Sequence, residues 1–356
     1  MTATMSRIRK IEDPMDLMSK MEALKEAVDS IVQTFAVQFD IALVTDGMPG
    51  APDGDDVVYG STLALTNDEI NYQYACVFSK DVAQMLTRKL FEMEPDEATS
   101  MEDMGDALNE IPNVAAGVWK AKREKSAGEH YQLGLPIFLK GNSWIKYFPR
   151  GVNAIAQKLK GPEGVSLQVI LIWQYGINAG GNQLMTTQTA DSTKAQGSNV
   201  PMQVLKEAVK AVVDTCAIQM DLPLEVDPNP SDPRQADVKY GSSIALTSET
   251  GGWNLAVMAN QPSAEALTRN LFAMEADETP EMEDMADGIG EIANVAAGVM
   301  KASRAAAGQK VQLGLPLFME GRSCIEFFAS GIQGMAQTVR GENGLEVHVI
   351  LIWQEG

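Results

Sequence analysis

The chain contains two copies of one sequence, and this internal repeat constrains its fold more than any other feature. Sliding the chain against itself aligns MEALKEAVDSIVQTFAVQFD, from Met21, with MQVLKEAVKAVVDTCAIQMD, from Met202, an offset of 181 residues (202 minus 21). The match continues through GLPIF and GLPLF to VILIWQ in both copies. A period this long exceeds that of a solenoid repeat, and two copies cannot close a propeller, so each copy should form its own core.

The segment between the copies is typical of a flexible connector. It reads QYGINAGGNQLMTTQTADSTKAQGSNVP, which is rich in small polar residues and has almost no apolar periodicity. A chain of 356 residues is also longer than one hydrophobic core usually supports. We therefore predict a first domain over residues 14–174, a flexible linker over 175–200 and a second domain over 201–354.

Each copy combines helical and strand patterns. Apolar residues recur at helical spacing after Pro14, and the matching helix of the second copy starts near Pro201. The segments VVYGSTLALT and INYQYACVFS predict paired strands, and two helices follow over roughly 80–92 and 101–122. The letters GPEG and GENG supply the bend of a closing hairpin in each copy. Strands separated by a helical block predict an α+β fold, with helices packed on one face of a mainly antiparallel sheet.

The charge balance restricts the class of partner. The chain has 28 Lys and Arg against 48 Asp and Glu, a net charge of −20. This charge repels nucleic-acid phosphate and anionic lipid head groups, so we expect neither nucleic acid nor a membrane as a partner. The first residues have basic clusters but no apolar run after them, and the longest apolar stretches are strand-sized. We therefore expect a cytoplasmic protein.

The cysteines and histidines form no repeated pattern. Cys76, Cys216 and Cys324 align with other residue types in the opposite copy, so we predict buried, reduced thiols. His130 and His348 are the only histidines and are not equivalent, which gives little basis for a His-based metal site or base. We expect no cofactor or metal of the chain's own.

One predicted helix carries a polar stripe opposite its apolar stripe, in both copies. In the first copy, spacings of three and four place Leu108, Ile111, Ala115 and Val118 on the apolar stripe. The polar stripe faces roughly 150° away from it at about 100° of rotation per residue, so its carboxylate and carboxamide project outward side by side. It consists of Asp106, Glu110, Asn113 and Gly117.

The second copy repeats both stripes. Its polar stripe is Asp287, Glu291, Asn294 and Gly298, backed by Ile289, Ile292, Ala296 and Val299. A solvated helix face explains such a pattern without any function. However, an Asn inside a helix and small neighbours that permit close approach also fit a docking surface.

These residues match a known motif. The sequence resembles the CheC, FliY and CheX family of chemotaxis phosphatases, whose pattern is Asp/Ser-x3-Glu-x2-Asn-x22-Pro, and it is most similar to the CheX type. The first copy fits the pattern from Asp106 to Pro136, with 22 residues between Asn113 and the proline. In the second copy, the corresponding interval, from Asn294 to Pro316, is 21 residues. The deletion lies at a predicted helix-to-strand connection, where length changes are tolerated.

The resemblance implies a phosphatase that dephosphorylates the aspartyl phosphate of a CheY-type receiver domain. It implies that Asn113 and Asn294 hold the attacking water, and that Glu110 and Glu291 pair with a lysine of the receiver. Mg²⁺ is then supplied by the bound receiver. It also implies pairing of the two copies within the chain as a pseudo-dimer. We expect the aspartates to cap or support the start of the helix and the prolines to shape the following strand; these are Asp106, Asp287, Pro136 and Pro316.

The two copies differ inside this helix. Pro112 removes a backbone N–H and can kink the first helix between Glu110 and Asn113, at about 3 kcal/mol. Gly288 and Gly290 weaken the second helix by only about 1 kcal/mol each. We therefore predict that the second copy has the better site.

Two alternatives stay open at the level of the sequence. The first is a non-catalytic module that binds a receiver or a component of the flagellar switch. The second is an assembly protein whose polar stripes are merely solvated.

Overall fold

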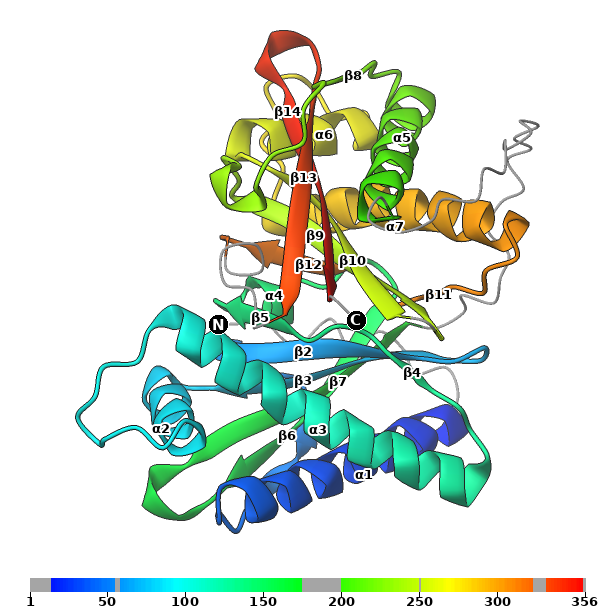
Figure 1. The fold of residues 1–356 in the computed structure, drawn as a ribbon. Helices are drawn as coiled ribbons and strands as arrows, with labels where there is room; N and C mark the ends of the chain where they lie inside the picture. The colour runs from blue at the N-terminus through cyan, green and yellow to red at the C-terminus, as the bar shows by residue number, and fades with distance from the viewer. Residues whose placement is uncertain (1–13, 55–57, 175–199, 250, 323–330, 355–356) are drawn as a thin grey trace.

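The computed structural model describes residues 14–54, 58–174, 200–249, 251–322 and 331–354. These residues form two units of similar design, one above the other in Figure 1. The predicted linker lies outside the described residues, except for Val200, and so does Cys324. No helix of the described part is long and apolar enough to cross a membrane.

The first unit opens with a long helix and closes with a hairpin. In chain order its elements are α1 (Pro14–Gln38), β1 (Val44–Gly50), β2 (Tyr59–Thr66), β3 (Asn71–Phe78), α2 (Lys80–Leu90), α3 (Met101–Ala127), β4 (Gln132–Leu133), β5 (Ile137–Lys140), α4 (Ser143–Lys146), β6 (Val152–Lys160), η1 (Pro162–Gly164) and β7 (Ser166–Gln174). The helix predicted to end near residue 122 runs on to Ala127, because Gly128 in the left-handed conformation stops it (φ 68°).

The second unit repeats this order with a short 3₁₀ turn added, apart from α4, whose aligned residues 323–326 lie outside the described residues. Its elements are α5 (Val200–Met220), β8 (Glu225–Val226), η2 (Pro233–Gln235), β9 (Tyr240–Ser248), β10 (Gly251–Ala259), α6 (Gln261–Phe272), α7 (Met282–Ala306), β11 (Gln312–Leu313), β12 (Leu317–Glu320), β13 (Ile332–Arg340), η3 (Glu342–Gly344) and β14 (Glu346–Gln354). The predicted hairpins form in both units, with Glu163 and Asn343 at φ 57° in their bends.

Each unit is built on a seven-stranded antiparallel sheet. The strand order is β1-β6-β7-β3-β2-β4 in the first sheet and β11-β9-β10-β14-β13-β8 in the second, while β5 and β12 pair with β2 and β9. The described strand pairs are all antiparallel, so the predicted α+β class is confirmed.

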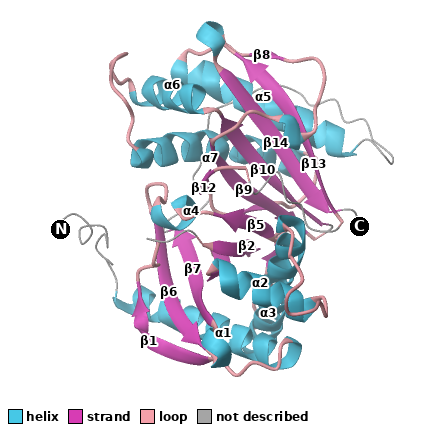
Figure 2. Ribbon diagram, turned by 90° about the vertical axis from the view of Figure 1, so that its left-hand side faces the viewer, coloured by secondary structure: helices cyan, strands magenta, loops and turns pink. Residues whose placement is uncertain are grey.

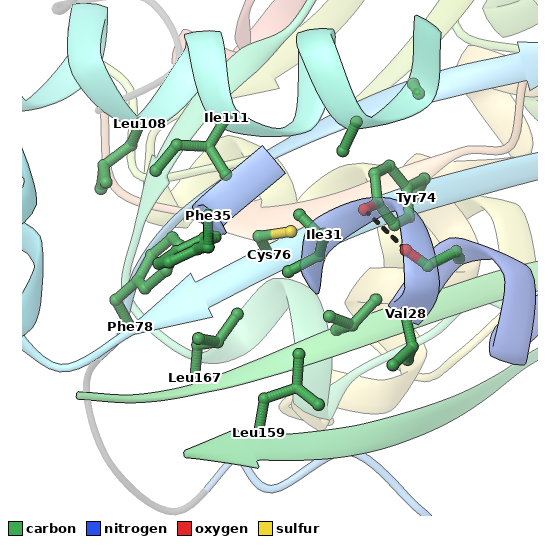
Figure 3. Packing of buried hydrophobic residues seen from close by; sticks show 14 of the residues in the cluster. Val28, Ile31, Phe35, Tyr74, Cys76, Phe78, Leu108, Ile111, Leu159 and Leu167 are labelled. Carbon is green, nitrogen blue, oxygen red and sulfur yellow. Dashed lines mark hydrogen bonds between the residues drawn. The ribbon is translucent and has the colours of Figure 1, made fainter. Parts of the chain in front are cut away.

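One face of each sheet is covered by helices. In the first unit, alternate side chains of β3 pack with the apolar sides of α1 and α3 (Figure 3). Tyr74, Cys76 and Phe78 belong to this layer, together with Phe35 of α1 and Ile111 of α3. Cys76, and Cys216 in the core of the second unit, are buried free thiols, as predicted.

The other face of each sheet is covered by the other unit. The intervening side chains of β3, Ala75 and Val77, belong to a buried cluster that also contains Ile350 and Ile352 of β14 in the second unit. This two-sided cover explains why every residue of β2 is buried. In Figures 1 and 2, the two sheets face each other. At the boundary lie α4 and β5 of the first unit and β12 of the second.

Equivalent residues of the two copies meet at this interface. The Oγ1 atoms of Thr66 and Thr247 lie 2.6 Å apart in a buried hydrogen bond. Such a contact between identical positions places both threonines beside the axis that relates the two units. Glycines allow the close approach nearby: a Cβ added at Gly134 would lie 3.4 Å from the Cβ of Ala245.

Candidate functional site

The helix that carries the polar stripe of the first copy is α3. It begins with a capping box, in which the Ser100 hydroxyl accepts from the Asp103 backbone and the Asp103 carboxylate accepts from the Ser100 backbone. The helix is unbroken from Met101 to Ala127, so it continues through Pro112, whose side chain is buried. The possible kink therefore does not interrupt the helix between Glu110 and Asn113.

The predicted apolar stripes are correct except at their C-terminal ends. Leu108, Ile111 and Ala115 are fully buried, but Val118 is only half-buried and Trp119 takes its place in the core. In α7 the same position, Val299, is 46% exposed and its neighbour Met300 is buried. The reason is geometric: at 3.6 residues per turn, a stripe followed at spacings of three and four drifts around the helix.

The predicted polar stripes lie on the opposite side. Glu110, Asn113 and Glu291 are exposed, and Asn294 is half-buried. In each copy the Glu and the Asn are three residues apart on one continuous helix, so their side chains lie on the same face. A carboxamide both donates and accepts hydrogen bonds, whereas an ionised carboxylate only accepts them, so each pair can orient a water beside a cationic partner group.

Each stripe ends in a glycine that faces open space. A Cβ added at Gly117 or at Gly298 would meet no atom of the described residues within 4 Å, apart from its sequence neighbours and the nearby backbone of its own helix. A helix-interior glycine costs about 1 kcal/mol relative to alanine. Packing inside the described part of the chain does not explain this cost, which leaves both positions open to close approach by another molecule.

The glycines unique to α7 have a different explanation. A Cβ at Gly288 would lie 3.3 Å from Oγ1 of Thr268 on α6, and a Cβ at Gly290 would lie 2.9 Å from Cγ of Pro149. Pro149 belongs to the first copy, in the connection between α4 and β6. These two glycines therefore let neighbouring segments pack closely against α7.

Neither aspartate is the N-cap of its helix, so the capping part of our expectation is wrong. The caps are Ser100 in α3 and Glu281 in α7, and each aspartate lies in the second turn. Asp287 instead accepts a hydrogen bond from the backbone N of Arg150 of the first copy, at 2.6 Å, and forms an ion pair with Nε of the same arginine, also at 2.6 Å.

A pocket beside α7 contains residues of both copies. The second copy contributes Phe272, Asp287, Gly290, Glu291, Asn294 and Pro316, and the first copy contributes Pro149, Arg150 and Gln174. The candidate pair of the second copy thus lies in a pocket walled partly by the first. Sequence reasoning missed these three residues. A comparison of the copies could have indicated that the two sites differ, because Gly290 aligns with Asn109 and Arg150 aligns with Ser330.

The motif prolines lie at the start of short strands. Pro136 immediately precedes β5, and Pro316 immediately precedes β12 and lines the same pocket. Among the described residues, no group of three or more His, Cys, Asp or Glu side chains is placed to hold a metal ion.

Comparison with known proteins gives a family match in both copies. A sequence model of the family described as chemotaxis phosphatase CheX matches residues 61–160 and again residues 241–339. Together the two regions make up more than half of the chain and include α3 and α7. No curated protein matches the chain.

Several solved structures are similar to one copy. The chemotaxis protein CheX from Desulfovibrio desulfuricans is 16% identical, covers 43% of this chain and 99% of its own, and has a TM-score of 0.37. CheX from Vibrio vulnificus is 15% identical, with the same coverages and a TM-score of 0.38. CheX from Borrelia burgdorferi, solved as a CheX-CheY-BeF3-Mg²⁺ complex, is 18% identical over 43% of this chain and 97% of its own, with a TM-score of 0.35.

Proposed function

The chain belongs to the chemotaxis phosphatase CheX family, and from this we propose that it hydrolyses the aspartyl phosphate of a CheY-type receiver domain. One observation carries the proposal. In both copies a Glu and an Asn share the exposed face of an unbroken helix that is anchored on the sheet. The open glycine one turn after each Asn supplies room for the partner.

The proposed reaction needs little covalent chemistry from this chain. Water attacks the phosphorus, the bond between phosphorus and the receiver's aspartyl oxygen breaks, and inorganic phosphate and a free aspartate result. Such a transfer depends mainly on positioning and on stabilising charge. The carboxamide of Asn113 or Asn294 accepts from the water, fixing it in line with the bond that breaks.

The glutamates fix the orientation of the receiver. An exposed carboxylate at Glu110 or Glu291 is suited to a charge-assisted hydrogen bond with a lysine of the receiver. The net charge of −20 favours a partner that presents a cation. Mg²⁺ is expected to arrive with the receiver.

We propose further that the two copies act as a pseudo-dimer within one chain. The shared buried cluster and the hydrogen bond between Thr66 and Thr247 support this arrangement. Sedimentation equilibrium is expected to give the mass of one chain, 38.5 kDa, across a wide concentration range. A mass that doubles with concentration would contradict it.

The function is tested by single replacements of the two asparagines. We expect Asn294→Ala to slow receiver dephosphorylation more than Asn113→Ala does, and the double variant to abolish the acceleration. Asn229→Ala, an exposed asparagine remote in sequence from both helices, is the matched control. Binding of beryllofluoride-activated receiver without any faster phosphate release by the parent chain would instead support the non-catalytic module.

A further inference from the structure

The second copy's candidate site includes a cation from the first copy. Arg150 lies on the connection that follows α4, and it lines the same pocket as Glu291 and Asn294. Its backbone N donates to Oδ1 of Asp287 at 2.6 Å, and its Nε forms an ion pair with Oδ2 of the same carboxylate at 2.6 Å. Its guanidinium carbon lies 5.7 Å from the ring centroid of Phe272, within the range of a cation–π contact.

These contacts hold Arg150 in place without burying it. The Asp287 side chain is only 13% exposed, whereas the Arg150 side chain is 68% exposed. Neither Nη atom of Arg150 has a hydrogen-bond partner among the residues that the structure describes. A guanidinium held by this ion pair and still 68% exposed keeps N–H donors available to another molecule, and its planar shape matches carboxylate and phosphoryl oxygens.

The acidic charge at this site favours such a cation. Asp287 and Glu291 are four residues apart on α7, so two like charges lie on one face of the helix. A phosphorylated receiver is anionic at its phosphorylation pocket and would be repelled by both. Arg150 neutralises Asp287, leaves Glu291 to bind a cation, and adds an attractive group at the rim of the pocket.

Only one of the two copies can receive this arginine. At the position of Arg150 the second copy has Ser330, which carries no charge, and at the position of Pro149 it has Ala329. On the receiving helix, Gly290 makes room for Pro149, while Asn109 at the same position of α3 is buried and accepts a hydrogen bond from Ser61. The segment that supplies the arginine and the helix that receives it therefore both differ between the copies.

We propose that Arg150 of the first copy is a receiver-binding residue of the second copy's site. Its guanidinium donates to anionic oxygens around the receiver's phosphorylated aspartate, and the packing of the two copies thereby completes the second site. This inference rests on the proposed phosphatase function and specifies which residues recognise the substrate.

The test uses the full chain carrying Asn113→Ala, in which only the second site is intact. We expect Arg150→Ala in this background to raise KM for the phosphorylated receiver about tenfold while kcat changes less than about twofold, since the lost group binds the partner without positioning the water. The dependence of KM on salt should also weaken, because one charge contact is lost. Arg150→Lys should recover part of the loss. Arg340→Ala, which removes another exposed arginine paired with acidic residues, is the matched control.

The possible results of this experiment distinguish a failure of the proposed phosphatase function from a failure of the role assigned to Arg150. If the Asn113→Ala parent does not accelerate phosphate release, the proposed function fails at the second site. If the parent is active and Arg150→Ala leaves KM and its salt dependence unchanged, only the role of Arg150 is overturned. A fall in activity with an unchanged salt dependence and no recovery by Arg150→Lys would also overturn it, because it would assign Arg150 to packing. Comparing unphosphorylated with beryllofluoride-activated receiver shows whether the contact is to carboxylate or to phosphoryl oxygens.

Discussion

Two glycines of α7 should respond in opposite ways to the same substitution. Gly290→Ala and Gly298→Ala each replace a helix-interior glycine, and each gains about 1 kcal/mol of helix stability. At Gly298 the new methyl group meets nothing within 4 Å in the described part of the chain beyond its sequence neighbours and the nearby backbone of α7. We therefore expect Gly298→Ala to raise the free energy of unfolding by about 1 kcal/mol.

At Gly290 the same methyl group meets a rigid neighbour. It would lie 2.9 Å from Cγ and 3.3 Å from Cβ of Pro149. A proline ring cannot rotate away, so the segment that carries it must shift, and such overpacking costs about 1–3 kcal/mol. Because the helix contribution is common to both variants, Gly290→Ala should be less stable than Gly298→Ala by about 1–3 kcal/mol.

Urea unfolding of the full-length chain, followed by circular dichroism, measures this difference. A double-mutant cycle tests its cause: Pro149→Ala removes the Cγ atom, so Gly290→Ala should cost less in that background. Equal stability of the two glycine variants, or a cost that persists without the proline ring, would refute the packing of the first copy against α7. Gly298→Ala should also slow receiver dephosphorylation despite its greater stability, because it fills the open end of the polar stripe.

Two further predictions concern buried titratable groups. Burial raises the pKa of the Cys76 and Cys216 thiols to about 12, so neither thiol should be alkylated in the folded chain at about pH 8. Mass spectrometry after alkylation of the folded and of the unfolded chain measures this, and rapid labelling of the folded chain would contradict the prediction. Burial, opposed by Glu346, lowers the pKa of His348 below its usual 6.5. Its neutral form therefore stabilises the fold fully above about pH 6.5, and this contribution is lost as the pH falls through the folded-state pKa. As the pH is lowered, the free energy of unfolding should accordingly decrease less for His348→Gln than for the unchanged chain. An identical decrease would show that His348 does not contribute to the acid sensitivity.

Much of the architecture was predictable because it depends on local patterns. The repeat identified two units, and the GPEG and GENG bends identified the closing hairpins. The period of the apolar residues in α3 and α7 separated a buried side from an exposed side that carries Glu110 and Glu291. Periodicity succeeds here because residues three and four apart are neighbours in any helix.

Contacts across the repeat had no such signature. Asp287 was expected to cap or support its own helix; it does not cap it, and it binds Arg150, which is 137 residues away in the sequence. The alternation of β3 indicated two faces, yet nothing local shows that the face containing Ala75 and Val77 packs on a second sheet.

The sequence by itself determined the duplicated α+β unit and the helix face that bears a carboxylate and a carboxamide. Only the tertiary structure decided that the two sheets cover each other and that Pro149 and Arg150 reach the pocket of the other copy. The physical reason is that helices and hairpins form from interactions between near neighbours, whereas the fit between two folded surfaces depends on side chains that are far apart in the sequence.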